Sequence, residues 1–411
     1  MSRILTTHAG SLTRPRAVLD FLVAIDQGLP YDEAAYEQAL ADAVDDVVRR
    51  QAEAGIDVID DGEMGKATWI TYLYERVSGI EPRMVPLEGG NILPPSRDRL
   101  AFPEFYAEHD AAFAREVENQ VRIADTGAQS PAAPAEIEAE GKNWFCTGEI
   151  RYDSAALERD IARLKRSLAG VDVVDAFLPV VAPASVYWLR NEFYPTEEDF
   201  IYAVADALHE EYKGIVDAGF LVQVDDAVLM HEYDSILSLG GSVEDYRKWA
   251  ELRVDALNHA LSGIPEDRIR YHVCYGSWHG PHVFDPPFAE LIDLVLKVRA
   301  RYYLFEQANP RHEHEWRVWE GKKLPAGKIL IPGVVTHHTI TVEHPRLVAD
   351  RILRFARLVG RENVIAGTDC GFAQAQYIAR AATSVMWAKF EALAEGARIA
   401  SAELWPKRAI A

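Results

Sequence analysis

Residues 329–368 read ILIPGVVTHHTITVEHPRLVADRILRFARLVGRENVIAGT, a stretch with the pattern of a strand, a helix and a second strand. We expect the strands over Ile329–Val335 and Val364–Thr368 and the helix over Pro345–Val359. Neither strand alternates apolar with charged residues, and such continuous apolar runs are typical of parallel strands that are buried on both faces. The stretch therefore predicts an α/β fold with a parallel sheet.

The same alternation of strands and helices extends towards the N-terminus. Six further strands are expected at Leu5–His8, Asp57–Asp61, Val173–Val181, Leu221–Asp225, Tyr271–Cys274 and Tyr303–Glu306. Amphipathic stretches predict helices at Tyr36–Ala54, Ala155–Ala169, Tyr202–Ala218, Val243–Leu261 and Gln376–Ala394. Eight strands without a Gly-x-Gly-x-x-Gly turn favour a closed (β/α)₈ TIM barrel over an open dinucleotide-binding sheet.

One stretch interrupts this rhythm. Helical periodicity fades between residues 71 and 150, where Pro94-Pro95, Pro103 and the segment SPAAP at 130–134 occur. Prolines at this density are typical of loops and insertions. We therefore predict a single catalytic barrel domain over residues 1–411, with an irregular insertion at about residues 71–150, after the second strand.

Composition narrows the class of protein. The chain has 411 residues and a formal net charge of -21, which argues against nucleic-acid binding because that needs a basic surface. No apolar run approaches the roughly 18 residues of a membrane helix, and the first residues lack the features of a secretory signal, so we expect a cytoplasmic protein without membrane contact. The three cysteines are too few for a disulfide framework. The sequence leaves the oligomeric state open, and a homo-oligomer is compatible with it.

Titratable residues recur at or just past the C-terminal ends of the expected strands. They are His8, Glu63, Asp225, His272, Cys274, Glu306, His338 and Cys370. Barrel enzymes form their active sites at this end of the barrel. The recurrence therefore predicts a functional site at the barrel mouth.

The pair His272 and Cys274 is separated by one residue on an expected strand. Side chains two residues apart on a strand point the same way, so both can face one point in the barrel mouth. Together with Glu306 and Cys370 they offer one imidazole, two thiolates and one carboxylate, a set that suits zinc. The residues alone leave two interpretations open: a zinc site, or two small buried cysteines beside a hydrogen-bonded core histidine.

Taken together, these motifs resemble those of the C-terminal catalytic barrel of the cobalamin-independent methionine synthases. The resemblance covers nearly the whole chain in scattered motifs. The zinc ligands of that family are a His-x-Cys pair, a later Glu and a late Cys. The resemblance thus implies a zinc enzyme of methionine biosynthesis with His272, Cys274, Glu306 and Cys370 as metal ligands.

The resemblance also implies residues that bind the amino-acid substrate. Ala9-Gly10-Ser11-Leu12 is similar to a family stretch that contacts the substrate carboxylate, which assigns Ser11 and the adjacent His8 to the substrate site. Gly62-Glu63 and Gln223-Val224-Asp225 are similar to the motifs whose carboxylates hold the homocysteine ammonium group. Two carboxylates around one cation are chemically reasonable, because the cation relieves their mutual repulsion.

A third set of positions concerns the alkyl donor and the proton. Gly333–Thr339 is similar to the family motif with the proton-donating histidine, which makes His338 the catalytic acid and His337 an outward-facing neighbour, either hydrogen-bonded or solvent-exposed. Trp188 is expected to line the donor pocket, although packing in the core is the commoner role of such a residue.

The sequence departs from the family in three ways. The chain lacks the second, N-terminal barrel, Thr336 stands where the family has Asp, and Asp226-Ala227 replaces Glu-Pro. These departures argue against a polyglutamyl folate as methyl donor. The segment Gly276–His282 resembles the single-barrel branch that includes epoxyalkane:coenzyme M transferase, and it makes His279 and His282 candidates for a substrate loop.

Three hypotheses about function follow. The first is a zinc-dependent methyltransferase that alkylates a small-molecule thiol, homocysteine or a similar amino thiol. The second is addition of a sulfonate thiol to an epoxide by the same thiol activation. The third is a barrel that binds zinc and a thiol without turnover, which would not need a proton donor such as His338. The sequence does not identify the alkyl donor.

Overall fold

Eight parallel strands form the centre of the molecule in a computed structural model that describes residues 2–86, 96–112, 115, 140–186 and 189–406. Their order in the sheet is β1-β11-β10-β9-β8-β7-β5-β2. Their bounds are β1 Leu5–Thr6, β2 Val58–Ile59, β5 Asp175–Val181, β7 Leu221–Asp225, β8 Ile269–Val273, β9 Tyr302–Phe305, β10 Ile329–Val335 and β11 Ile365–Thr368. A parallel bridge between Thr7 and Val58 joins the two edges of the sheet. The TIM-barrel prediction is confirmed, and each of the eight expected strands is present.

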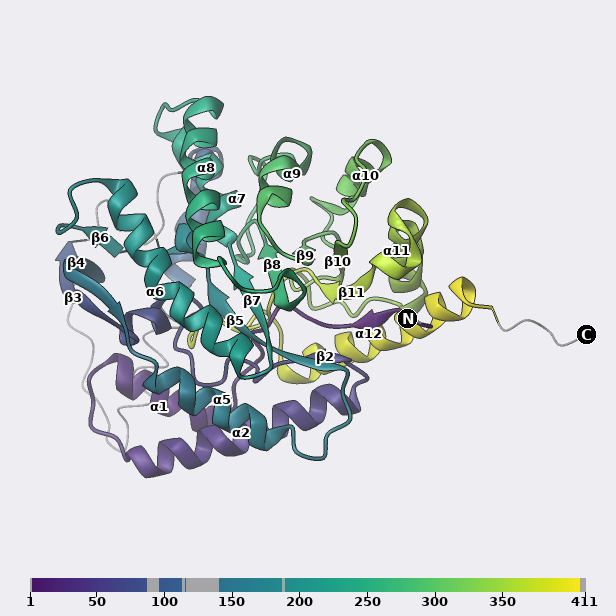
Figure 1. The fold of residues 1–411 in the computed structure, drawn as a ribbon, viewed down its shortest axis with the longest axis horizontal. Coiled ribbons are helices and arrows are strands. Elements are labelled where there is room, and N and C mark those ends of the chain that lie inside the picture. The colour runs from purple at the N-terminus through teal and green to yellow at the C-terminus, as the bar shows by residue number, and fades with distance from the viewer. Residues whose placement is uncertain (1, 87–95, 113–114, 116–139, 187–188, 407–411) are drawn as a thin grey trace, which may run out of the picture.

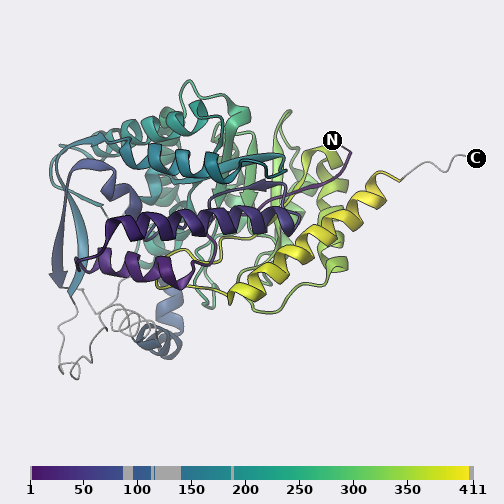
Figure 2. The same ribbon diagram turned by 90° about the horizontal axis from the view of Figure 1, so that it is seen from below.

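Helices surround the strands (Figures 1 and 2). They are α1 Arg16–Asp26, α2 Glu33–Glu53, α5 Ala155–Ser167, α6 Glu197–Asp217, α7 Ala227–Ser238, α8 Val243–Ala260, α9 Phe288–Lys297, α10 Val318–Gly321, α11 Pro345–Val359 and α12 Thr383–Leu404. The last helix begins later than the sequence indicates, because residues just after β11 form a loop in which the Phe372 amide donates to the Ser11 carbonyl, 2.7 Å away. Within the described residues, no helix is long and apolar enough to cross a membrane.

The excursion after β2 is more regular than the sequence indicates. It contains the short helices η1 (Thr71–Glu75) and α3 (Arg97–Ala101). Its strands β3 (Val77–Pro86) and β4 (Glu140–Tyr152) pair antiparallel, and β6 (Leu189–Asn191) joins β4 to complete a small separate sheet. Figure 1 shows this sheet beside the barrel. The sequence signal was weak because these strands mix polar and apolar residues and pair with partners that are distant in sequence.

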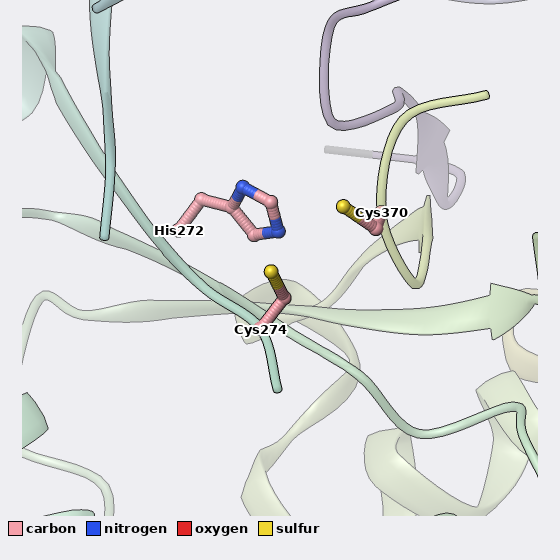
Figure 3. Close-up of side chains that lie close together, drawn as sticks. All are labelled: His272, Cys274 and Cys370. Atoms are coloured by element: carbon pink, nitrogen blue, oxygen red, sulfur yellow. The ribbon is translucent and has the colours of Figure 1, made fainter. Parts of the chain in front are cut away.

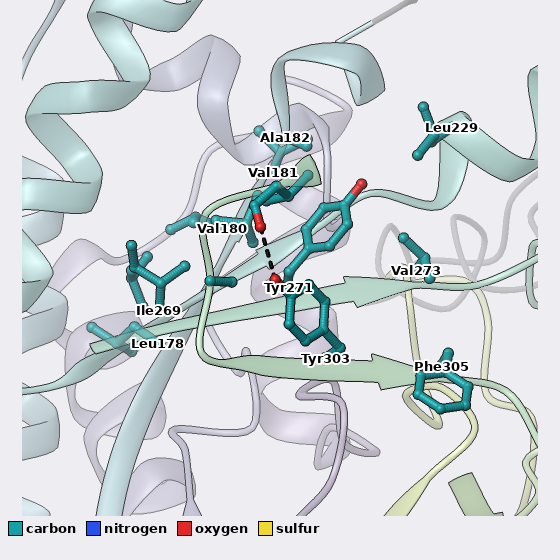
Figure 4. Close-up of a cluster of buried hydrophobic side chains, with 14 of the residues drawn as sticks. Leu178, Val180, Val181, Ala182, Leu229, Ile269, Tyr271, Val273, Tyr303 and Phe305 are labelled. Carbon is teal, nitrogen blue, oxygen red and sulfur yellow. Dashed lines mark hydrogen bonds between the residues drawn. The ribbon is translucent and has the colours of Figure 1, made fainter. Parts of the chain in front are cut away.

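Alternation along the strands decides which side chains reach the barrel interior. On β8, Ile269, Tyr271 and Val273 pack outward with the helix layer in the main apolar cluster (Figure 4). The intervening side chains point inward: Arg270 donates to Thr7 Oγ1 at 3.0 Å and to the His8 carbonyl at 2.7 Å, both at the end of β1. His272 lies on the same face of β8 as Arg270 and one step closer to the mouth of the barrel.

Candidate active site

Three side chains that can ligate a metal converge at the barrel mouth, and we call them the metal group: His272, Cys274 and Cys370 (Figure 3). Their ligand atoms lie within 4.8 Å of one another, and all three residues are buried. His272 belongs to β8 and Cys274 follows that strand, whereas Cys370 lies in the loop after β11. The parallel barrel thus brings together strand ends that are far apart in the sequence.

Asp225 orients the imidazole of His272. The Nδ1 atom of His272 lies 2.8 Å from Asp225 Oδ1, a contact that fixes the proton on Nδ1 and leaves Nε2 as the ligand atom. Nε2 is buried and has no nitrogen or oxygen partner among the described residues. A buried free nitrogen beside two thiols is costly without a partner, and this donor set fits a transition-metal ion.

The two thiols differ in acidity. A hydrogen bond from the Cys274 thiol, helped by His272 and opposed by burial, lowers the pKa of Cys370 to about 6. The same hydrogen bond and burial raise the pKa of Cys274 well above its usual value. Burial lowers the pKa of His272, but its contacts with Asp225 and Cys370 outweigh burial and raise this pKa to about 10. Cys370 is therefore the sulfur that is ready to be a thiolate.

Glu306, the fourth expected ligand, lies at the end of β9 but outside the group of three. It is 1% exposed. Its Oε1 accepts from the Tyr275 amide at 3.0 Å, and its Oε2 accepts from Asn309 Nδ2 at 2.6 Å. Burial raises the pKa of Glu306, but His338 outweighs it and the pKa is lowered overall. The Tyr275 amide, Asn309 and His338 thus favour the carboxylate as an anion near the thiols.

Glu63 is fixed by a strained turn. Gly62 and Glu63 have φ values of 69° and 56°, which place a side chain other than glycine in the left-handed region. Asp60 Oδ1 accepts from the Gly62 amide at 2.8 Å and Asp61 Oδ1 from the Glu63 amide at 2.9 Å. Asp60 and Asp61 are buried, and their hydrogen bonds hold this turn.

The Glu63 carboxylate needs a positive partner. Its pKa is raised to about 7. Burial is the main cause, Lys66 opposes the shift, and Asp225 adds to it. Glu63 Oε2 is buried without a hydrogen-bond partner among the described residues, with Lys66 Nζ 3.9 Å away. A Cβ on Gly10 would lie 2.8 Å from Glu63 Oε1, so glycine at this position leaves room for the carboxylate. The pair Glu63 and Asp225 therefore forms an acidic pole at the mouth.

Ser11 and His8 frame this pole from β1. A Cβ on Gly371 would lie 2.1 Å from Ser11 Oγ, which places the hydroxyl against the residue that follows Cys370. His8 is 1% exposed, with Nε2 2.6 Å from Gln51 Oε1 and Nδ1 accepting from the Gly10 amide at 3.2 Å. Both ring nitrogens of His8 contact protein groups, so in this arrangement His8 positions the Gly10 turn.

His338 lies at the barrel mouth, next to Glu306. Its Nε2 is 3.4 Å from Glu306 Oε2, and its side chain is 16% exposed, so it can meet a ligand. The expectation that His337 points outward is wrong. His337 is 0% exposed, its ring centre lies 4.1 Å from that of His338, and neither of its nitrogens has a partner in the described part of the chain. The loop after β10 is not extended here, and the alternation rule for strands does not apply to it.

The remaining expected residues lie at the rim or outside the described residues. His279 is exposed, with its ring centre 6.1 Å from that of His338. His282 is buried and its two nitrogens contact Asp285 Oδ2 and the Trp278 carbonyl, each at 3.0 Å. Trp188 lies outside the described residues.

Two polar residues of the site went unnoticed in the sequence. Asn309 binds Glu306, and Asp369 Oδ1 accepts from the backbone amides of Gln307 and Ala308 at 2.7 and 2.8 Å, which fixes the segment after Glu306. The position of Asp369 next to Cys370 is a signal that could have revealed it. Asn309 follows Glu306 by three residues within a loop, and such a spacing carries no signal outside regular structure.

Comparisons with known proteins agree with the geometry. No protein-family model matches the chain. The chain is 24% identical over 371 residues to the methionine synthase of Sulfolobus acidocaldarius, with 89% of this chain and 85% of that protein covered. It is 23% identical over 402 residues to the 2-hydroxypropyl-CoM lyase of Xanthobacter autotrophicus, with 90% and 88% covered.

A solved structure extends the comparison. A B12-independent methionine synthase of a Shewanella species, in complex with selenomethionine, matches with a TM-score of 0.69 at 18% identity and covers 98% of this chain and 99% of that chain. This likeness supports the barrel fold. The relatives confirm the resemblance to both branches that the motifs indicated.

Proposed function

We propose that this chain is a zinc-dependent transferase that activates a small-molecule thiol and alkylates it, with methyl transfer to homocysteine or a similar amino thiol as its reaction. The observation that carries the proposal is the convergence of His272, Cys274 and Cys370 beside the Glu63–Asp225 pole. Relatives named methionine synthase support this reaction. A reducing cytoplasm suits it, because the ligand thiols must stay reduced.

His272, Cys274 and Cys370 would hold the zinc, with Glu306 as the fourth ligand. The donor set and the unpartnered Nε2 of His272 fit this ion. Bound zinc would lower the pKa of a substrate thiol and so supply a thiolate at neutral pH. Asp225 contributes by holding His272 in the tautomer that presents Nε2.

Glu63 and Asp225 would bind the substrate ammonium group. Asp225 Oδ1 is occupied by His272 and Gln223, whereas its Oδ2 has no hydrogen-bond partner among the described residues. Glu63 Oε2 is similarly free of hydrogen bonds there. An ammonium group between these two oxygens would relieve the repulsion that now raises the pKa of Glu63. Ser11 would orient the carboxylate end of the same molecule.

His338 would supply the proton that the leaving group needs. It contacts Glu306 through Nε2 and retains some exposure at the mouth, where a donor molecule would enter. Because thiol activation does not require His338, the acid and the nucleophile are provided by separate groups.

The proposal is tested by metal analysis of the purified protein and by mass spectrometry after incubation with homocysteine and a panel of methyl donors. We expect about one zinc per chain and methionine as product. Zinc-free protein with full activity would refute the metal assignment. Zinc-bound protein that binds homocysteine but makes no product with any donor would favour a binding protein without turnover.

The relative named 2-hydroxypropyl-CoM lyase supports a second reaction, thiol addition to an epoxide. The same assay separates the two reactions, because an epoxide and 2-mercaptoethanesulfonate would yield a thioether without release of a donor fragment. Product from this pair, with none from homocysteine, would make the second reaction the function.

A further inference from the structure

The guanidinium group of Arg380 lacks a counter-ion. Its Nε donates to the neutral oxygen Oε1 of Gln374 at 3.1 Å, and its backbone amide donates to the Phe372 carbonyl at 2.8 Å. In the described part of the chain, no carboxylate lies within ion-pair distance of it. The residue is only partly exposed. A guanidinium group has five N–H donors, so most of those of Arg380 remain unused by the protein.

Several other buried arginines of this chain are paired with carboxylates. Arg76 contacts Asp160 and Glu211, and Arg351 contacts Glu313 at 3.0 Å. Removing a charge from water without a partner is costly, and a guanidinium with unused donors is suited to bind a carboxylate or phosphate group.

The buried Arg14 and Arg270 have no carboxylate partner in the described part of the chain, but both terminal nitrogens of each donate to oxygen atoms of the protein. The terminal nitrogens of Arg380 have no such acceptor among the described residues.

Arg380 lies within electrostatic reach of the active site. Burial lowers its pKa to about 10, and the Cys370 thiolate acts in the opposite direction. Burial and then the charge of Arg380 lower the pKa of His279, and burial, His338 and Arg380 lower that of His337. The geometry agrees: Gln374, which accepts from Arg380 Nε, donates through its Nε2 to Cys370 Sγ at 3.9 Å. The positive charge of Arg380 therefore lies beside the candidate metal ligand Cys370.

His337 provides independent evidence for a missing ligand. It is completely buried, and both of its ring nitrogens lack partners among the described residues. A neutral imidazole has one N–H to donate, and leaving that hydrogen bond unmade inside a protein costs about 1–3 kcal/mol. An oxyanion next to Arg380 would accept from such a donor.

We propose that Arg380, together with His279 and His337, forms a subsite for an oxyanion, namely a carboxylate, sulfonate or phosphate group on one of the two substrates. The identification of its bearer as a substrate rests on the proposed function. The guanidinium supplies permanent charge and a planar pair of donors, which matches such a group. The subsite complements the acidic pole, which would hold a cation.

Calorimetric titration with ethanesulfonate tests the subsite, because this anion has no thiol and does not depend on metal binding. We expect R380Q to bind it at least about tenfold more weakly than the wild type, in line with a charged hydrogen bond. R380K should be intermediate. The control is R398Q, which makes the same change of net charge at an exposed ion pair with Glu395 on α12 and should bind like the wild type.

Repeating the titration with saturating L-homocysteine identifies which of the two substrates carries the oxyanion. Undiminished ethanesulfonate binding assigns the anion to the alkyl donor, and displacement assigns it to the thiol substrate. Equal affinity of R380Q and wild type, or no binding to the wild type, overturns the subsite. Zinc content and homocysteine affinity, measured on the same samples, show whether a variant is folded and report separately on the proposed function.

Discussion

The two arcs of the barrel mouth differ in how their charged and polar groups are hydrogen-bonded. On the arc of β7, β5 and β2, the carboxylates of Glu63 and Asp225 are set in place by the protein: Asp61 binds the Glu63 amide, and Gln223 binds Asp225 Oδ1 at 2.9 Å. On the arc of β8 to β11, Arg380 and His337 retain donors that no described residue accepts. Within the described part of the chain, the first arc thus has carboxylate oxygens without a hydrogen-bond donor, and the second has N–H donors without an acceptor.

This difference indicates a site that is complete only with its substrates. The acidic pole is close to the metal group through the contact between Asp225 and His272, so it belongs with the thiol. The arc of β8 to β11, which we call the basic arc, carries His338, the group positioned to donate a proton. Nucleophile and leaving group would thus meet between opposite charges, an arrangement that stabilises charge transfer between them.

The metal group comes from the ends of β8 and β11, and its loss should have the largest effect. We expect Cys370→Ser to lose most of its zinc and to lower turnover by more than about a thousandfold, because the hydroxyl is a poor ligand for this ion. Metal analysis and turnover measurements check this. Cys146→Ser is the matched control, since Cys146 is also buried but lies on β4 and donates to the Gly148 carbonyl. Equal zinc content in the two variants would contradict the assignment.

The next effect concerns the basic arc. His338→Asn should keep zinc and thiol binding while turnover falls by about 10²–10⁴-fold, the usual range for general acid catalysis. The effect should shrink with a donor whose leaving group needs no proton. His314→Asn, at an exposed position on the helix η5 (Glu313–Arg317), should be silent. His337→Asn cannot serve as the control, because the His337 ring is buried against His338.

The strand ends were predictable because two periodic signals agree there. The apolar runs located all eight strands, and the alternation on β8 placed His272 and Cys274 on one face. The same rule failed at His337, because the loop after β10 is set by local contacts: Thr336 Oγ1 accepts from the His338 amide at 3.1 Å. Sequence spacing carries no directional information where the backbone is irregular.

The hydrogen bonds and charge contacts between distant parts of the chain could not be predicted from the sequence either. Glu306 occupies its expected place at the end of β9, yet its hydrogen bonds to Tyr275 and Asn309 depend on how two loops pack. Arg380 carries no motif, and the subsite proposed around it depends on the absence of a carboxylate near it among the described residues. Long-range pairing likewise determines β3 and β4, which the sequence indicated as irregular.

A smaller effect tests the acidic pole. Glu63→Gln should weaken binding of homocysteine by about ten- to a hundredfold, as expected for loss of a charged hydrogen bond, and should leave binding of a thiol without an amine nearly unchanged. Asp225→Asn should show the same preference and in addition weaken zinc binding, since Asp225 orients His272. Glu149→Gln, at an exposed ion pair with Arg151, is the control. Equal losses for both thiols would remove the ammonium role and favour the sulfonate thiol.

The smallest predicted effect concerns Thr336, which stands where the resembling family has Asp. Its hydroxyl accepts from the His338 amide at 3.1 Å, and its own amide donates to Glu343 Oε1 at 2.9 Å, so the side chain helps to hold the loop that presents His338. Thr336→Ala removes the first bond and keeps the second. A neutral hydrogen bond contributes about 0.5–1.5 kcal/mol, so we expect turnover to fall about two- to tenfold with zinc content and thiol affinity unchanged. Thr336→Ser retains the hydroxyl and should recover most of the loss. If the Ser variant is as slow as the Ala variant, packing of the Thr methyl group rather than this hydrogen bond positions His338.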